Sequence, residues 1–245
     1  MRAVVLAAGL GTRLGDLTAD RQKGALLVGG RPLVAHVVEH LHRCGFGEIA
    51  VNLHYRPEQV REALADARPR ITWFEERDIL GTAGALEPMR DFLGREPAFL
   101  IHYGDVLTDH DLGAMLKRHR EREALLTMLV HQRQGSNSVV EVDVDLRVRA
   151  FLERPSPSER AGFESPWVNS GVYVGSASLL DDLPRPPSDV ARDLVPRALE
   201  RGPVFAEPLA GYRCAVDSPE RLEEARAAFL SGRWAPPLWD AETTP

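Results

Sequence analysis

The sequence predicts an α/β fold in which helices cover both faces of a mostly parallel central sheet. In the first half of the chain, short apolar stretches alternate with helical patterns in the order β-α-β-α-β-α-β, which is typical of such a sheet. The first stretch, residues 3–8, is apolar at every position, as in strands that are buried on both faces. With 245 residues, 44% of them hydrophobic, the chain is long enough for one well-buried domain.

The elements of the first half have clear local signals. Pro32 suits the first turn of a helix, and Gly45 suits its end. A second helix opens at Pro57, and Asp109 is expected to cap a later one. The expected strands are residues 3–8, 48–53, 70–74 and 98–103, and the expected helices are residues 32–45, 57–67, 85–93 and 109–123. Glycine-bearing loops, residues 9–26 and 75–84, follow the first and third strands.

The second half changes character, because strands there outnumber helices. The expected strands are residues 125–131, 138–142, 148–152, 167–174 and 212–216, with a hairpin through residues 143–145. The expected helices are residues 190–200, capped by Ser188, and residues 219–230, stopped by Gly232. No linker marks a boundary, so we expect one domain over residues 1–232 and an irregular, proline-rich tail over residues 233–245.

Composition narrows the function. The net charge of −6 argues against a nucleic-acid partner, which needs a basic surface. No apolar run approaches the roughly 20 residues of a membrane span, so no membrane partner is expected. Cys44 and Cys214 are the two cysteines of the sequence, which favours a cytoplasmic protein without a disulfide framework.

The loop after the first strand points to an anion. Its sequence, LAAGLGTRLGDLTADRQKG, spans residues 6–24 and carries Arg13 and Lys23 among glycines. The 30 basic residues include two lysines, Lys23 and Lys117, so a lysine in this loop stands out. Backbone N–H groups and two cations suit a phosphate chain. The Walker string is absent, and the dinucleotide fingerprint fails because Leu14 stands where its third glycine belongs.

Six ordered motifs, which together cover residues 1–229, resemble the sugar-1-phosphate nucleotidyltransferases, or nucleotide-sugar pyrophosphorylases. They are LAAGLGTRL with QKGALLVGGRPLV, LGTAGAL (80–86), YGDVLTD (103–109), FLERP (151–155), WVNSGVYV (167–174) and VDSPERL (216–222). The likeness is greatest to short mannose- or heptose-1-phosphate guanylyltransferases. It implies a Rossmann-like three-layer sandwich with a mostly parallel mixed central sheet, the GT-A-like nucleotidyltransferase fold.

The chain departs from the family pattern at three places. Gln22-Lys23-Gly24 replaces Pro-Lys-Pro, which predicts a looser loop. Arg154 replaces the lysine of Glu-Lys-Pro and can still meet a phosphate, in a bidentate manner. Asp217 is followed directly by Ser218, which shortens that turn. None of these changes removes a needed charge.

The resemblance implies transfer of a nucleoside monophosphate from an NTP to a sugar 1-phosphate, giving an NDP-sugar and pyrophosphate. GTP is the favoured donor, and dTTP, UTP and ATP remain alternatives. The sugar is not readable from the sequence. The reaction needs two anions held in line and their charge neutralised, and Mg²⁺ is the implied cofactor. Members of the family often form dimers, so a homodimer is possible here.

The resemblance also assigns residues to roles. The catalytic residues are Arg13, which would grip the leaving pyrophosphate, Lys23, which would contact the α-phosphate or sugar phosphate, and Asp105. The nucleotide-binding residues are Leu6, Ala7, Ala8, Gly9, Gly11, Thr12, Arg13, Lys23, Gly81, Thr82, Gly84 and Asp105. The sugar-phosphate-binding residues are Tyr103, Gly104, Glu153, Arg154, Asn169 and Gly171. Asp105 and Asp217 would share the Mg²⁺.

Three alternatives compete with this interpretation. His36, Glu39 and His40 match a zinc-peptidase string, although we expect them on a solvent-facing side of their helix. Asp109-His110-Asp111 resembles the Asp-x-Asp of metal-dependent glycosyltransferases that use NDP-sugars, which would leave Arg13 and Lys23 unexplained. The third is a nucleotide-binding regulator without catalytic activity.

Overall fold

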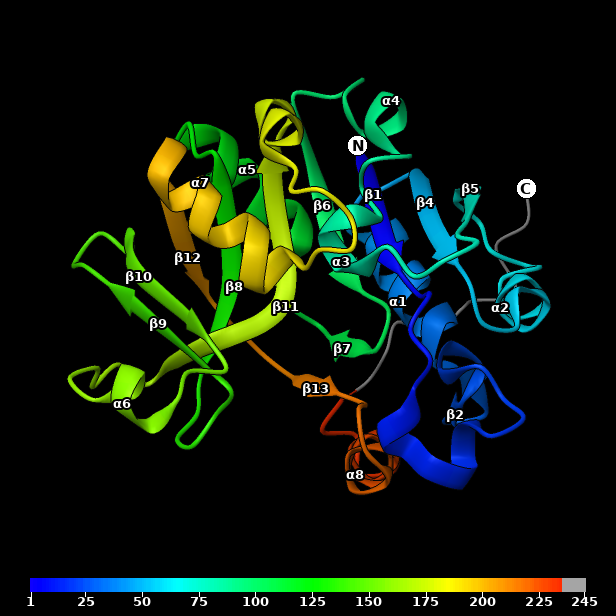
Figure 1. The fold of residues 1–245 in the computed structure, drawn as a ribbon. Helices are drawn as coiled ribbons and strands as arrows, with labels where there is room; N and C mark the ends of the chain where they lie inside the picture. The colour runs from blue at the N-terminus through cyan, green and yellow to red at the C-terminus, as the bar shows by residue number, and fades with distance from the viewer. Residues whose placement is uncertain (235–245) are drawn as a thin grey trace.

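A seven-stranded sheet forms the centre of the molecule (Figure 1). The computed structural model describes residues 1–234. In spatial order the strands are β12 (Val204–Pro208), β8 (Leu126–Gln132), β11 (Trp167–Ser176), β6 (Ala98–Tyr103), β1 (Arg2–Leu6), β4 (Glu48–Leu53) and β5 (Arg70–Glu75). β11 runs antiparallel to both of its neighbours, and the other adjacent pairs are parallel. The predicted mostly parallel mixed sheet is therefore confirmed.

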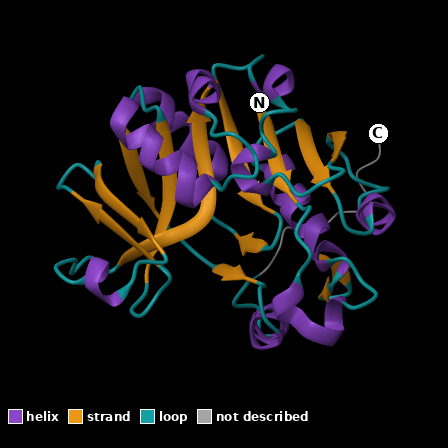
Figure 2. Cartoon of the chain, viewed as in Figure 1, coloured by secondary structure: helices purple, strands orange, loops and turns teal. Residues whose placement is uncertain are grey.

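Helices cover both faces of this sheet, as Figure 2 shows. The first face carries α1 (Leu33–Arg43), α2 (Pro57–Ala63), α5 (Leu112–Glu121) and α8 (Pro219–Leu230), and the second carries α3 (Gly81–Gly84), α4 (Arg90–Leu93) and α7 (Val195–Arg201). Side chains of β1 alternate between the two cores, with Ala3 and Val5 in the first and Val4 in the second. All three are fully buried, and burying a valine contributes about 1.5–3 kcal/mol.

Beside the seven-stranded sheet, residues 1–234 form three two-stranded sheets. β9 (Ser138–Val142) and β10 (Val148–Glu153) form the predicted hairpin, which stands off the end of the main sheet together with α6 (Pro157–Arg160) (Figure 1). β2 (Leu27–Val28) pairs with β3 (Arg31–Pro32). β7 (Val106–Thr108) pairs with β13 (Arg213–Ala215), and this small ladder positions part of the site described below.

Several local predictions are wrong in detail. The expected strand 3–8 ends at Leu6, and the helix 85–93 is replaced by the short helices α3 and α4. Asp111, rather than Asp109, caps α5 by accepting a hydrogen bond from the Ala114 amide at 2.8 Å. Ser188 caps no helix, because its hydroxyl donates to the Pro184 carbonyl.

Strand β12 was not predicted. It lies at the edge of the seven-stranded sheet, where it pairs with β8 on one side and makes an isolated antiparallel bridge from Phe205 to Arg147 on the other. Its sequence, VFAEP, ends in proline and contains a glutamate, both of which are depleted in strands. Glu207 is nevertheless buried there, because its carboxylate pairs with Arg118. Tertiary contacts thus overcome a weak local signal.

The chain beyond α8 packs back onto the molecule. Trp234, at the start of the predicted tail, is 2% exposed. Its ring stacks on Tyr212 at a centroid distance of 5.6 Å and meets His36 edge-on at 5.2 Å. The rest of the predicted tail, residues 235–245, lies outside the described residues. Within residues 1–234, no helix has the length and hydropathy needed to span a bilayer.

Candidate active site

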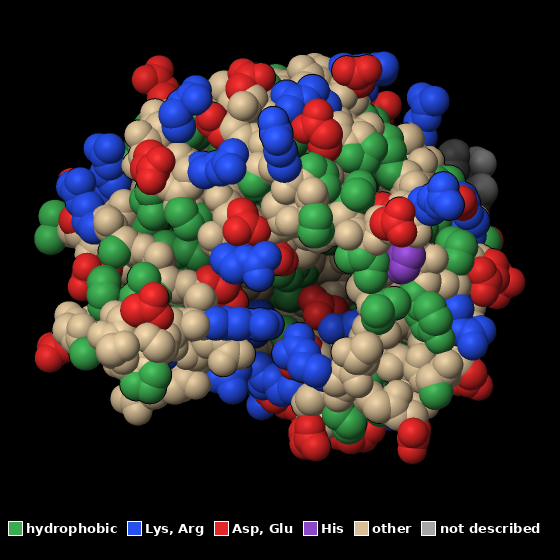
Figure 3. Space-filling view, viewed as in Figure 1, with side chains coloured by type: hydrophobic (Ala, Val, Ile, Leu, Met, Phe, Trp, Pro, Cys, Tyr) green, Lys and Arg blue, Asp and Glu red, His purple; other side chains and the backbone are tan. Residues whose placement is uncertain are grey.

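A cavity of about 560 Å³ opens where β1 and β6 end. In Figure 3 this face is hollowed at its centre, with acidic and basic side chains gathered around the hollow. In β1, Leu6 lies between Asn52 of β4 and Tyr103 of β6, so three neighbouring strands deliver residues to one wall. Of the predicted site residues, the cavity is lined by Leu6, Ala7, Ala8, Gly9, Gly11, Thr12, Arg13, Lys23, Gly81, Thr82, Tyr103, Gly104, Asp105 and Asp217.

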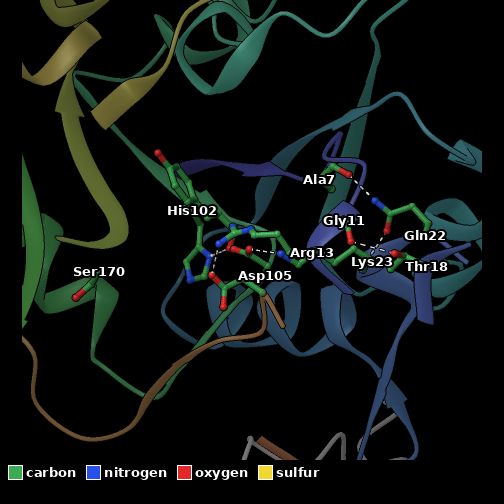
Figure 4. Close-up of polar contacts among 12 residues, drawn as sticks. Ala7, Gly11, Arg13, Thr18, Gln22, Lys23, His102, Asp105 and Ser170 are labelled. Atoms are coloured by element: carbon green, nitrogen blue, oxygen red, sulfur yellow. Dashed lines mark hydrogen bonds and ion pairs between the residues drawn. The ribbon is translucent and has the colours of Figure 1, made fainter. Parts of the chain in front are cut away.

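Two ion pairs lie at the polar end of the cavity. Arg13 Nη1 lies 2.8 Å from Asp217 Oδ2, and the Lys23 ammonium pairs with the Asp105 carboxylate. The Lys23 side chain is 14% exposed, whereas that of Arg13 is 62% exposed. Figure 4 shows Arg13, Lys23 and Asp105 pointing toward one another. The two predicted cations and the two predicted metal ligands therefore share one wall.

The ladder between β7 and β13 brings the two acids together. Ala215 pairs with Val106, and the Val216 amide donates to the Asp105 carbonyl at 2.8 Å. Asp105 precedes β7 and Asp217 follows β13, so this antiparallel pairing places the two carboxylates at the same end of the ladder. The sequence predicts the later strand but gives no sign of its three-residue partner.

The Asp105 carboxyl lies in an environment that favours its charge. Burial acts to raise its pKa, but the Lys23 ammonium and the Arg213 guanidinium outweigh burial and hold the pKa below its ordinary value. Arg213 itself donates to the Ser170 carbonyl at 3.1 Å. Asp105 is thus ionised at neutral pH, as a metal ligand must be.

The glycine loop brings its backbone up to the cavity. Gly11 has φ +68°, a conformation that favours glycine, and its carbonyl accepts hydrogen bonds from the Leu14 amide and the Thr18 hydroxyl. A Cβ at Gly9 would meet no atom of the described chain within 4 Å, so the backbone there faces open space. A bound molecule can therefore approach the peptide groups closely.

Two side-chain amides hold the peptide groups of Ala7, directly after β1. The Ala7 amide donates to Asn52 Oδ1 at 2.6 Å, and Gln22 Nε2 donates to the Ala7 carbonyl at 2.6 Å. Gln22 is 1% exposed, and its other amide atom accepts from the Gly24 amide. The prediction of a looser loop is therefore wrong, because side-chain hydrogen bonds tie residues 22–24 to the end of β1.

The motif LGTAG packs against residues 188–189, which the sequence analysis placed at the start of a helix and not at the site. Gly81 has φ +78°, and a Cβ there would overlap the backbone of Ser188. The Ala83 amide donates to the Ser188 carbonyl at 2.9 Å, and the Thr82 hydroxyl donates to Asp189 Oδ1 at 3.1 Å. Ser188, Asp189 and Arg192 also line the cavity. None of the six family motifs covers this stretch, so the sequence did not indicate that it belongs to the site.

Glu76 and Asn52 are further cavity residues that the sequence analysis missed. They are 8% and 4% exposed. Asn52 Nδ2 donates to Glu76 Oε1 at 2.6 Å, and the Leu80 amide donates to Glu76 Oε2 at 3.0 Å. A buried carboxylate therefore stands fixed on the wall beside Ala7. Asn52, a polar residue among the apolar residues 49–53 of β4, is the sign of it in the sequence.

Four of the predicted sugar-phosphate residues, and Gly84, do not line this cavity. Asn169 serves the protein itself, because its amide donates to the Tyr173 hydroxyl at 2.6 Å and accepts from the Gly171 amide at 3.1 Å. Gly171 approaches Tyr103, since a Cβ there would lie 3.1 Å from that ring. Tyr103 lines the cavity, so Gly171 and its partner Asn169 lie behind this part of the wall.

Glu153 and Arg154 lie near the same border, at the end of β10. Burial raises the pKa of the Glu153 carboxyl, Arg154 opposes this shift, and Asp189, which lines the cavity, adds to it. Arg154 has φ +52° and is 73% exposed. Its guanidinium lies 3.8 Å from Glu153, so the two side chains pair with each other in this structure.

The residues of the rival motifs are occupied elsewhere. Asp109 accepts from the Tyr212 amide, Asp111 caps α5, and neither lines the cavity. His36 and His40, expected on a solvent-facing side, are 3% and 8% exposed, and each bonds a backbone carbonyl at 2.8 Å. Across residues 1–234, no group of three His, Cys, Asp or Glu side chains could hold a metal ion. The zinc interpretation therefore has no ligand set in this part of the chain.

The sheet and its cavity define an α/β protein whose cavity lies at the carboxyl ends of parallel strands, the place where such sheets bind ligands. The chain belongs to the nucleotidyl transferase family, whose family model matches residues 2–212. It is 29% identical over 229 residues to a probable mannose-1-phosphate guanylyltransferase 2 of Oryza sativa subsp. japonica, covering 89% of this chain and 62% of that protein. It is also 29% identical to a mannose-1-phosphate guanyltransferase of Schizosaccharomyces pombe, and this match covers 94% of this chain and 65% of that protein. The chain thus spans less than two thirds of these relatives.

Solved structures share the fold. A candidate glucose-1-phosphate thymidylyltransferase from Bacillus anthracis, in complex with a sucrose, has a TM-score of 0.81 at 20% identity and covers 93% of this chain and 94% of its own. HddC from Yersinia pseudotuberculosis, complexed with GMP-PN, has a TM-score of 0.77 at 22% identity, and the match covers 93% of this chain and 99% of the HddC chain. The predicted fold is confirmed by these likenesses.

Proposed function

We propose that this protein transfers a nucleoside monophosphate from an NTP, with GTP favoured, to a sugar 1-phosphate, and that it releases pyrophosphate. The observation that carries the proposal is the pairing of Arg13 with Asp217 and of Lys23 with Asp105 on one cavity wall. A rigid strand end and a glycine loop lie beside these pairs. This arrangement suits a nucleoside whose phosphates reach the charged end.

The chemistry needs no protein nucleophile. An oxygen of the sugar phosphate forms a bond to the α-phosphorus of the NTP, and the bond from that phosphorus to the oxygen of the leaving pyrophosphate breaks. The attacking oxygen is already anionic, so no proton has to be removed from it. The protein holds the two anions in line and offsets their charge. Arg13 would bind the departing pyrophosphate, and Lys23 would bind the α-phosphate or the sugar phosphate.

The acidic pair fits a magnesium ion. Two carboxylates converge on the cavity, and oxygen ligands are those that Mg²⁺ prefers. Asp105 and Asp217 would hold the ion, with phosphate oxygens and water as the remaining ligands. When bound, it would neutralise charge on the phosphates. Before that, each acid is neutralised by a basic side chain of the protein itself.

Glu76 supports the preference for GTP. Guanine presents N1–H and N2–H₂ as neighbouring donors, and a carboxylate accepts from both. Thymine and uracil offer a single imide donor there, and adenine offers none at N1. Glu76 is fixed by Asn52 and by the Leu80 amide on the wall beside Ala7. The names of the rice and fission-yeast relatives agree with this preference and point to mannose 1-phosphate as the first acceptor to test.

Two further parts of the proposal concern the whole protein. The free thiols Cys44 and Cys214 are in keeping with a cytoplasmic location.

A homodimer would agree with the dimers that members of the family often form. Light scattering coupled to gel filtration measures the mass directly, and an elution mass of one chain would contradict the dimer.

A matrix of the four NTPs against a panel of sugar 1-phosphates, read by pyrophosphate release with Mg²⁺ and with EDTA, tests the proposed function. We expect the fastest release with GTP and loss of release in EDTA. Release of NDP from an NDP-sugar, without pyrophosphate, would instead identify a glycosyltransferase. NTP binding without turnover of any pair would identify a nucleotide-binding regulator.

A further inference from the structure

We propose that Gln22 is a positioning residue that sets the aim of Lys23 relative to a nucleoside held at the end of β1. This inference rests on the proposed function. Gln22 stands directly before Lys23, is buried, and is one of the residues that line the cavity. Both atoms of its side-chain amide are bonded to backbone groups of the protein.

The two bonds of the Gln22 amide connect two parts of the site. Nε2 donates to the carbonyl of Ala7, whose peptide lies on the nucleoside side, and Oε1 accepts from the amide of Gly24, which follows Lys23 (Figure 4). A group that donates at one atom and accepts at the other is required for both bonds, and a primary amide supplies it. Alanine would lose both bonds, whereas glutamate would lose the donor and keep the acceptor.

The surroundings of Gln22 leave one arrangement open. A Cβ at Gly24 would lie 2.9 Å from Gln22 Oε1 and 3.1 Å from Val34 Cβ, so a side chain at this position would push against the Gln22 amide. On the outer side of the loop, the Gln59 side chain accepts a hydrogen bond from the backbone N–H of Gln22 at 2.6 Å and donates one to the Asp20 carbonyl at 3.1 Å. Residues 20–24 are therefore anchored on both sides, and the inner anchor is the one that meets β1.

The consequence for catalysis is geometric. Ala7 directly follows β1, and Asn52 holds its amide. The Gln22 side chain connects Ala7 to the Gly24 amide, and so it fixes the backbone beside Lys23 relative to the end of β1. Loss of the inner anchor leaves the ammonium free to shift with its loop. A displacement of about 1 Å in a reacting group can cost 10²-fold in rate. Nucleotide affinity, which Arg13 and the cavity walls also supply, should change much less.

The experiment compares Gln22→Ala and Gln22→Glu with wild type, and uses Gln134→Ala, an exposed loop glutamine, as the matched control. With the most active pair of the matrix, we expect kcat of both Gln22 variants to fall roughly 10- to 100-fold, while the KM for NTP changes by less than about threefold. Gln134→Ala should behave as wild type. The isosteric Gln22→Glu keeps the side-chain volume, so a result is available even when Gln22→Ala folds poorly.

A double-mutant cycle separates positioning from general structural support. In a Lys23→Ala background, Gln22→Ala should reduce the rate by less than about twofold further, since the group that it positions is gone. Equal losses in both backgrounds would overturn the proposal, as would unchanged kcat in well-folded Gln22 variants. A purely structural role would lower the unfolding midpoint without this dependence on Lys23.

Hydrogen exchange of the Gly24 amide gives a readout that is independent of turnover. We expect faster exchange in Gln22→Ala, which removes the acceptor, and near wild-type exchange in Gln22→Glu, which retains it. If wild type turns over no substrate pair, the proposed function fails, and the exchange result alone then decides whether Gln22 fixes the backbone beside Lys23. Equal exchange in wild type and Gln22→Ala would reject the anchor itself.

Discussion

At the residue scale, the notable feature is that each cation of the site is paired with an acid before any substrate binds. Lys23 pairs with Asp105, and Arg13 pairs with Asp217. In the proposed reaction, a nucleotide would replace one set of contacts by another, with its phosphates at the cations and a metal ion at the acids. The balance of charge at this wall of the cavity depends on all four side chains.

Removing one member of a pair should abolish most of the turnover. We expect Lys23→Ala and Asp105→Asn each to lower kcat roughly 10²- to 10³-fold, because each removes a charge that faces the reacting phosphates. Both residues lie outside the regular strands, so far-ultraviolet circular dichroism should match wild type. Wild-type turnover in either variant would contradict the assigned roles.

Asp105→Asn should have an opposite effect on metal-free binding. Without the carboxylate, Lys23 is released and the cavity becomes more positive by one charge. We expect the affinity for GTP in EDTA, measured by titration calorimetry, to rise about fivefold, as the loss of one partly exposed ion pair suggests. Weaker binding than wild type would show that Asp105 does not compete with phosphate for Lys23.

The sequence predicted these charged residues because their motifs have fixed spacing. Arg13 and Lys23 stand in a glycine loop after a strand, and Asp105 ends another. It could not predict the role of Gln22, since a glutamine reads as an ordinary polar residue until its two backbone partners are known. Glu76 was missed for the same reason, because its fixing partner Asn52 comes from a different strand.

At the element scale, the turn at Gly81 locks the motif LGTAG against the segment around Ser188. Gly81→Ala should therefore raise the KM for NTP and lower the free energy of unfolding. The matched control is Gly30→Ala, because Gly30 has φ +79° but no described atom within 4 Å of its Cβ position. Both variants carry the backbone penalty of about 1–2 kcal/mol, and Gly81→Ala adds about 1–3 kcal/mol of overlap.

Urea unfolding of the two glycine variants, together with their KM values, measures this difference. Equal unfolding free energies and equal KM values would show that the contact with Ser188 contributes nothing.

Short elements such as α3 and α4 are hard to predict from the sequence, since each has four residues. The long helices were predicted from local signals: apolar spacing for α1, an expected cap for α5, and a start at Pro219 with a stop at Gly232 for α8. The strands β7 and β12 are too short or too polar to give such a signal.

At the scale of the whole molecule, three histidines make stability depend on pH. The pKa values of His102, His119 and His131 are lowered to about 4 from the ordinary 6.5, chiefly by burial, with neighbouring arginines contributing at His119 and His131. His119 bridges α5 to β8 and β11, with Thr127 Oγ1 at 2.9 Å and Ser176 Oγ at 3.1 Å. The unfolded chain therefore binds more protons than the folded one between these pKa values.

Stability should accordingly fall as the pH drops from about 6.5 toward 4. The folded state loses about 1–2 kcal/mol for each of His102 and His119 by pH 5, because folding must exclude the proton. The loss at His131 is smaller, because solvent screens this more exposed ring. Denaturant unfolding at pH 7 and pH 5.5, a window in which most carboxylates stay ionised, checks this. We expect a lower midpoint at pH 5.5, and identical midpoints would contradict it.

The architecture as a whole was the most predictable level. Apolar strands alternating with amphipathic helices leave few arrangements other than a covered sheet. The sequence did not show how the second half is divided between the main sheet and the hairpin of β9 and β10. That division depends on which strands meet across long separations, and periodicity within a strand contains no such information.

The pairing of β7 with β13 has a consequence for the order in which the protein is made. A nascent chain that has reached Tyr212 already contains every strand of the seven-stranded sheet, yet it lacks Asp217. The contact between Arg13 and Asp217 spans 204 positions, so the first cation emerges from the ribosome long before its acid. A growing polypeptide can thus complete its seven-stranded sheet while it still lacks Asp217, and the proposed metal site becomes complete only after β13 has been made.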